Sequence, residues 1–139
     1  MAYFAAGLDA ALWSYAYPYQ RRLLARAVEW AAREPAPLRV KAPLCVQATS
    51  WTQDDGKRLI VHLFNGINTT ANHGLPAADV PLREEVVPIH GIEVRLRAGP
   101  WRRFRMEPGG IPVETRKDGD ATVLEPPPLH LHAMLLGEV

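Results

Sequence analysis

The stretch from Leu44 to Asn65, LCVQATSWTQDDGKRLIVHLFN, constrains the fold more than any other part of this 139-residue sequence. Side chains alternate between the two faces of a β-strand, and here apolar residues fall on both faces of two successive runs. Asp54, Asp55 and Gly56 lie between the runs and accept the positive φ angles that tight hairpin turns require. The stretch therefore predicts a β-hairpin. Because both faces of its arms are apolar, we expect both to be covered by other parts of the protein.

The segment before the hairpin has the pattern of an amphipathic helix. Apolar residues repeat at helical spacing from about Pro18 to Arg33, and charged residues fill much of the other side. Pro18 suits the first turn of a helix, where its missing N–H costs nothing. Pro35 and Pro37 end the helix because proline cannot donate a backbone hydrogen bond. Further upstream, Ala2 to Phe4 predicts a short strand without an evident partner.

The remainder of the sequence predicts β-structure, because short alternating runs are separated by turn residues at intervals of about 8–12 residues. Besides the hairpin, the predicted strands are Leu38 to Val40, Ile92 to Leu96, Arg102 to Met106, Ile111 to Thr115, Ala121 to Leu124 and Leu129 to Leu136. The expected fold class is mainly β, an antiparallel β-sandwich of about 7–8 strands with an N-terminal α-helix. Alternation fails from Gly66 to Pro88, which predicts a long loop that binds a ligand or packs on a neighbour.

Composition is that of a soluble globular domain, with 47% hydrophobic and 22% charged residues. The formal net charge of +1 gives no strong field for nucleic acid or an anionic membrane, so neither is an expected partner. No run approaches the ~20 apolar residues of a membrane span. The start, MAYFAAGLDAALW, lacks the basic flank of a signal peptide. The sequence as written therefore predicts a cytoplasmic protein. The single cysteine, Cys45, lies in a strand pattern and is expected to pack rather than react.

Three histidines are the candidate metal ligands. His130 and His132 are two residues apart in a predicted strand, so their rings are expected on one face, and His62 lies in another apolar strand. Three imidazoles could bind zinc or iron if these strands were neighbours. The sequence offers no carboxylate at a supporting spacing. The alternative is half-buried histidines with a ring nitrogen bonded to backbone or water. We favour this alternative and expect no cofactor.

Aromatic residues near predicted turns suggest a second kind of site. Trp51 and Trp101, together with tyrosine residues, could form a flat surface that stacks on sugar rings. Polar side chains from the same region could hydrogen-bond the sugar hydroxyls, and these are Asn65, Asn68, Asn72 and His73. The alternative is that the aromatic residues cover one end of the sandwich.

Catalytic patterns are missing from the sequence. Most carboxylates lie in predicted turns or on predicted solvent faces, and none is in an apolar setting that would raise its pKa as a general acid requires. Ser14 and Ser50 lack a Gly-x-Ser-x-Gly setting, and no glycine-rich phosphate loop occurs. We therefore expect that the chain is not an enzyme by itself.

With these residues laid out, the order of features resembles the carboxy-terminal portion of bacterial glycoside hydrolases related to the family 42 β-galactosidases. The segment YFAAGLDAALWSYAYPYQRRLLARAVEWAA looks like the last strand and helix of their flavodoxin-like trimerisation domain. The segment LRVKAPLCVQATSWTQDDGKRLIVHLFNGINTT looks like the start of their small β-sandwich, and PPPLHLHAMLLGEV is similar to its closing strand. None of the catalytic carboxylates of the barrel in these enzymes has a counterpart here.

This resemblance implies that residues 1–34 are the remnant of a flavodoxin-like domain and that residues 35–139 form the sandwich. The chain would be a fragment of a longer glycosidase-like protein, with a non-catalytic accessory role and with other domains or subunits of that protein as partners. An exposed apolar patch is then expected where those domains are missing. Alternatively, the helix folds back on the sandwich as a self-sufficient domain. A carbohydrate-binding module, a metal-dependent enzyme using His62, His130 and His132, and a homo-oligomer also stay open.

Overall fold

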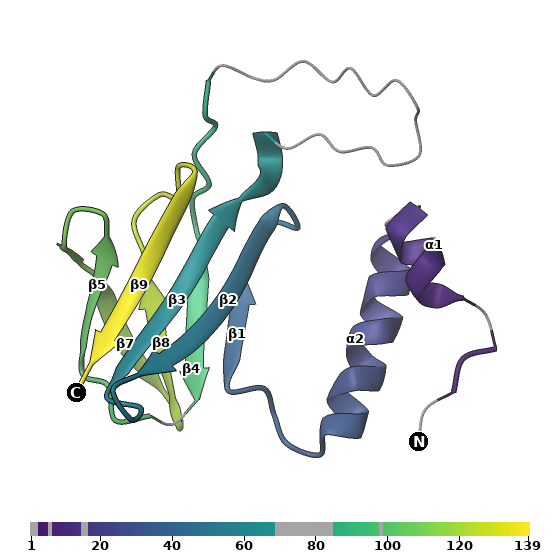
Figure 1. Ribbon diagram of the computed structural model, residues 1–139, viewed down its shortest axis with the longest axis horizontal. Helices are drawn as coiled ribbons and strands as arrows, with labels where there is room; N and C mark the ends of the chain where they lie inside the picture. Colours follow the sequence, from purple (N-terminus) through teal and green to yellow (C-terminus); the bar gives the residue numbers. More distant parts are fainter. Residues whose placement is uncertain (1–2, 6, 15–16, 69–84, 98) are drawn as a thin grey trace. The chain divides into compact units, whose positions relative to one another are not determined.

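The structure is a computed structural model that describes residues 3–5, 7–14, 17–68, 85–97 and 99–139. These residues form two compact units, the first ending at Ala36 and the second beginning at Pro37. The first unit contains the two α-helices, and the second contains the strands and one short 3₁₀-helix (Figure 1). The resemblance stated above divides the chain into residues 1–34 and residues 35–139, two residues before the boundary between these units. The assignment of the first part to a flavodoxin-like domain stays a prediction.

The first unit consists of α1 (Leu8–Ser14) and α2 (Pro18–Ala32). Helix α2 begins with Pro18 in its first turn and is followed by Arg33 in the left-handed region, with φ of 61°, so the predicted helix is confirmed. The strand predicted from Ala2 to Phe4 is wrong for its described part, because Tyr3 and Phe4 are not in a strand. Helix α1, which follows this segment, was not predicted from the sequence. No described helix is long and apolar enough to cross a membrane.

The second unit is a sandwich of two antiparallel sheets, which confirms the predicted fold class. Sheet A contains, in spatial order, β1 (Leu38–Lys41), β4 (Glu93–Arg97), β8 (Ala121–Glu125) and β7 (Glu114–Asp118). Sheet B contains, in spatial order, β2 (Val46–Gln53), β3 (Arg58–Asn65), β9 (His132–Glu138), β5 (Arg103–Glu107) and β6 (Ile111–Pro112). The 3₁₀-helix η1 (Gly66–Asn68) follows β3. The rest of the loop predicted from Gly66 to Pro88 lies mostly outside the described residues.

Strands β2 and β3 form the hairpin that the sequence predicts. Val46 pairs with Asn65 at its open end, and Gln53 pairs with Arg58 at its closed end. The turn contains Asp54 and Asp55, each with φ of 53°, and Gly56 with φ of 84°. Its backbone is closed by a hydrogen bond of 3.1 Å from Gly56 N–H to the Gln53 carbonyl. The turn chemistry and the alternation of buried residues along β3 together specify the register of these two strands.

The core lies between the two sheets, and its residues alternate with more exposed ones along β3, β4 and β9. In β3, Leu59, Val61 and Leu63 are buried, and β4 contributes Val94 and Leu96 from the opposite sheet. Val61, Leu63 and Val94 are fully shielded from solvent. Each such aliphatic side chain contributes about 1.5–3 kcal/mol when it is removed from water. Cys45 is half-buried and packs against this core, in accord with the packing role expected for it.

The strand predicted from Ile111 to Thr115 is divided between the two sheets. Strand β6 pairs with β5 in sheet B, whereas β7 pairs with β8 in sheet A. Val113 lies between β6 and β7, is 7% exposed, and donates its N–H to the Phe104 carbonyl at 3.1 Å. The chain therefore crosses the sandwich at this buried valine. Alternation continues through the crossing, so the sequence predicts one strand where the structure has two.

Candidate functional site

The outer face of sheet B carries the candidate site. In β3, Ile60, His62 and Phe64 alternate with the buried core residues and are only half-buried. Beside them lies Trp51 of β2, with 66% of its surface exposed, and no residue of β2 is buried. The expectation that both faces of the hairpin are covered is therefore wrong for the described residues. One face forms the core, and the other presents aromatic side chains to solvent.

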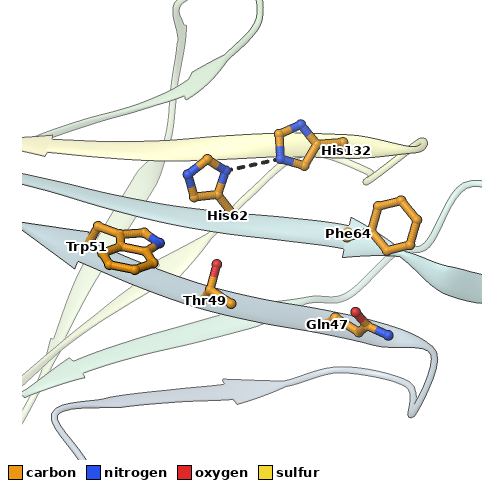
Figure 2. A pocket seen from close by; sticks show the side chains of 6 residues that line it. All are labelled: Gln47, Thr49, Trp51, His62, Phe64 and His132. Carbon is orange, nitrogen blue, oxygen red and sulfur yellow. Dashed lines mark hydrogen bonds between the residues drawn. The ribbon is translucent and has the colours of Figure 1, made fainter.

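A shallow hollow of about 370 Å³ lies on this face (Figure 2). We call it the Trp51 hollow. Its lining comes from alternate residues of three neighbouring strands, namely Gln47, Thr49 and Trp51 of β2, His62 and Phe64 of β3, and His132 of β9. Because these strands are hydrogen-bonded neighbours with β3 in the centre, the lining side chains are held on a regular lattice.

His62 and His132 contact each other in the Trp51 hollow. His62 Nδ1 lies 3.2 Å from His132 Nε2 (Figure 2), which is a hydrogen-bonding distance. The rings are stacked, with centroids 5.4 Å apart and planes inclined by 24°. One ring donates its N–H and the other accepts, so each imidazole keeps its second ring nitrogen for another partner. The two side chains therefore form one polar unit beside Trp51.

The third histidine is not part of this unit. Strand β9 begins at His132, so the alternation that would align the rings of His130 and His132 does not extend to His130. The backbone carbonyl of His130 instead accepts a hydrogen bond of 2.6 Å from the side chain of Asn65. Among the described residues there is no group of three or more histidine, cysteine or acidic side chains that could hold a metal ion. The metal-dependent enzyme therefore gains no support from this part of the chain.

Asn65 serves the interior of the fold. It is 1% exposed, and its side-chain Nδ2 donates to the carbonyls of Val87, at 2.8 Å, and His130, at 2.6 Å. Its Oδ1 accepts the N–H of Ile67 at 3.0 Å. Both amide hydrogens are thus used within the protein, which leaves none for the hydroxyl of a sugar. The remaining predicted ligand residues give no geometry, since Asn72 and His73 lie outside the described residues and Asn68 is described only as part of η1.

The two tryptophans proposed as sugar platforms have different environments. Trp101 is partly buried against the core and donates its Nε1–H to the Gly56 carbonyl at 3.0 Å. It fixes the hairpin turn and is structural. Trp51 is largely exposed in the hollow. Gln47, Thr49 and Phe64 line the same hollow and were not predicted as site residues, although Gln47 and Thr49 share the face of Trp51 by two-residue spacing.

The outer face of sheet A is different, because it is covered with ion pairs. Nη1 of Arg95 lies 2.7 Å from Oδ2 of Asp118. Arg116 pairs with two carboxylates, since its Nη2 lies 3.0 Å from Oε2 of Glu93 and its Nε lies 3.1 Å from Oε1 of Glu125. A second hollow of about 440 Å³ includes Glu93 and Glu125 in its lining. Both of these carboxylates are ion-pair partners of Arg116, an arrangement that is typical of a solvated protein face.

Carboxylates on sheet B are also engaged by cations. Arg105 donates to Glu138 at 2.9 Å, and this hydrogen bond lowers the pKa of the Glu138 carboxyl. The N–H of Gly110 donates to Glu107 at 2.8 Å and, with Arg105, lowers the pKa of that carboxyl. Both shifts favour the ionised form. They are opposite to the raised pKa that a catalytic acid needs.

These features define a class of protein: an antiparallel two-sheet β-sandwich preceded by a helical unit, with one open sheet face lined by aromatic residues. Among solved structures the chain is similar to an α-L-fucosidase, isoenzyme 2 from Paenibacillus thiaminolyticus, with a TM-score of 0.76 and 20% sequence identity. The similarity covers 98% of this chain and 20% of the fucosidase chain, so this sequence spans about a fifth of that enzyme. No family model and no curated protein matches the sequence.

The similarity establishes a fold shared with part of a glycoside hydrolase. The resemblance to glycoside hydrolases is therefore supported at the level of the fold. The enzyme found is an α-L-fucosidase rather than a family 42 β-galactosidase, so the assignment to family 42 relatives stays a prediction.

Proposed function

We propose that this chain is a non-catalytic accessory domain of a glycosidase-like protein and that it packs against the catalytic part of that protein through α2. The observation that carries the proposal is the similarity to a glycosidase over 98% of the chain, because this coverage includes the helical unit as well as the sandwich. A similarity confined to the sandwich would give no information about the helical unit.

Helix α2 has the surface expected of a docking element. Leu23, Leu24, Ala27 and Trp30 share one helical face by their spacing. None of the fifteen residues of α2 is buried, and Leu23 and Trp30 are 48% and 63% exposed. Large apolar side chains in such a stripe favour association, since each square ångström removed from water contributes roughly 25 cal/mol. The proposed partner is the catalytic domain of the glycosidase-like protein.

The proposal that the chain is not catalytic by itself is supported by four of the described carboxylates. Glu107 and Glu138 have lowered pKa values, and Glu93 and Glu125 are paired with Arg116. Hydrolysis of a glycosidic bond uses two carboxyl groups, one of which must hold a proton near neutral pH. The lowered pKa values of Glu107 and Glu138 favour the ionised form and are opposite to that requirement. We therefore expect the purified chain to hydrolyse no aryl fucoside or galactoside.

Co-expression with the polypeptide encoded immediately upstream tests the accessory role. We expect that polypeptide to contain a glycosidase barrel and to elute with this chain as one complex in size-exclusion chromatography with light scattering. Leu23→Asp should abolish the complex, because a carboxylate in an apolar interface loses its hydration. Arg22→Ala, on the polar side of α2, is the matched control and should leave the complex intact.

Two outcomes would contradict the accessory role. The first is an upstream polypeptide without a glycosidase barrel. The second is that the chain forms only a homodimer and no complex when the barrel polypeptide is present, since α2 would then serve self-association.

A further inference from the structure

We infer that the Trp51 hollow on sheet B binds a neutral pyranose sugar, which stacks one ring face on the indole of Trp51 and places its hydroxyls against the His62–His132 pair. This site lies on the sandwich and does not involve α2. It rests on the proposed function only for the choice of fucose and galactose as probes.

The exposed indole supplies the apolar half of the site. Trp51 lies on β2, which is an edge strand of sheet B, and 66% of its surface is open to solvent. A tryptophan is a costly residue to leave in water, and Trp101 of the same unit is anchored by its hydrogen bond to Gly56. A pyranose has C–H groups directed outward from its ring face, and these can cover an indole without desolvating the sugar hydroxyls at the ring edge.

The side chains around the indole supply the polar half. The hydrogen bond between His62 Nδ1 and His132 Nε2 leaves the other nitrogen of each ring for a ligand. The amide of Gln47 and the hydroxyl of Thr49 line the same hollow. In the neutral histidine pair, the ring that donates the shared hydrogen bond keeps an acceptor nitrogen and the ring that accepts it keeps an N–H donor. The amide of Gln47 and the hydroxyl of Thr49 can each donate and accept, as a sugar hydroxyl also does. A sugar ring edge is therefore matched by donors and acceptors on one side of Trp51.

The charge of the lining selects the kind of sugar. Among the residues that the structure describes, no lysine, arginine, aspartate or glutamate lines the Trp51 hollow, whereas ion pairs of such residues cover the outer face of sheet A. A uronic acid or sulfated sugar would therefore find no counter-charge in the hollow. The volume of about 370 Å³ falls within the range of about 300–1,000 Å³ that is usual for small-molecule sites. These features favour one or two uncharged sugar rings.

Protein-observed NMR tests the inference with four probes: L-fucose, D-galactose, lactose and D-glucuronate. We expect L-fucose, D-galactose or lactose to shift the indole N–H signal of Trp51 and the backbone amide signals of Thr49 and His62 in a saturable way, with a millimolar dissociation constant. The two amide signals also report the affinity of variants that lack the indole. Trp51→Ala should weaken binding by at least about tenfold, which corresponds to about 1.4 kcal/mol. Because Trp51 is exposed, this variant should keep the backbone spectrum of the wild-type chain. His132→Ala should weaken binding severalfold.

The matched control is Trp30→Ala, which removes an equally exposed tryptophan, 63% against 66%, from the other unit. It should leave the sugar affinity unchanged. The inference is overturned if no neutral sugar produces a saturable shift, if D-glucuronate binds more tightly, or if Trp51→Ala binds as well as the wild-type chain. If no sugar binds but the complex through α2 still forms, the sugar site is refuted and the proposed accessory role is not affected.

Discussion

Replacing Asn65 by alanine should cost more stability than replacing any exposed residue of the hairpin. The side chain of Asn65 makes three hydrogen bonds, to the carbonyls of Val87 and His130 and from the N–H of Ile67. Each bond contributes about 1 kcal/mol net, and a buried partner left unsatisfied costs about 1–3 kcal/mol. The expected loss for Asn65→Ala is therefore about 3–5 kcal/mol, a large share of the 5–15 kcal/mol that is usual for a domain.

Urea unfolding followed by tryptophan fluorescence measures this loss, because Trp101 packs against the core. The control is Gln53→Ala at the exposed end of β2, which should change stability by less than about 0.5 kcal/mol. Asn65→Asp is a second variant. At neutral pH it places a carboxylate against the carbonyls of Val87 and His130, so it should cost at least as much as alanine. A loss below about 1 kcal/mol for Asn65→Ala would refute the structural role of this side chain.

Two further predictions concern sheet B. Arg105 lowers the pKa of Glu138, so this pair stabilises the fold above the unfolded-state glutamate pKa of about 4.3, and the contribution is lost as the pH falls through the lower native value. Arg105→Gln should therefore reduce the difference in urea midpoint between about pH 7 and about pH 3, and an unchanged difference would count against the pair. Gly137→Ala would place a Cβ atom 2.6 Å from Cε1 of Phe104, which should cost about 1–3 kcal/mol in the same assay. Phe104→Leu in the same chain should recover part of that loss, and equal stability of Gly137→Ala and wild type would show that the ring moves freely.

The sequence predicts a structural element well where that element is determined by a few neighbouring residues. The turn at Asp54, Asp55 and Gly56 fixes the β2–β3 hairpin, and Pro18 marks the start of α2. The alternation of apolar residues does not show where the chain changes from one partner strand to another. At Val113 the chain leaves one sheet for the other without any change in its apolar pattern, so the sequence shows no boundary. Sheet order depends on long-range packing and cannot be read from spacing.

The candidate site was only partly predictable for the same reason. Trp51 stands out by residue type, but its neighbours His62 and His132 come from strands far apart in the sequence, and their contact at 3.2 Å requires the β3–β9 pairing. Asn65 is of a residue type that often binds ligands, but its side chain lies in the interior of the fold. Its burial follows from hydrogen bonds to Val87 and His130, which no local pattern reveals.

Fluorine NMR of the chain labelled with 5-fluorotryptophan gives the most direct test of the account. The sequence contains four tryptophans, so single substitutions assign the signals of Trp30 and Trp51. We predict that adding the proposed partner, the polypeptide encoded immediately upstream, removes the solvent isotope shift of the Trp30 signal, because α2 becomes covered, and leaves that of the Trp51 signal unchanged. Protection of Trp51 with Trp30 still open to solvent would contradict both the proposed docking face and the open Trp51 hollow.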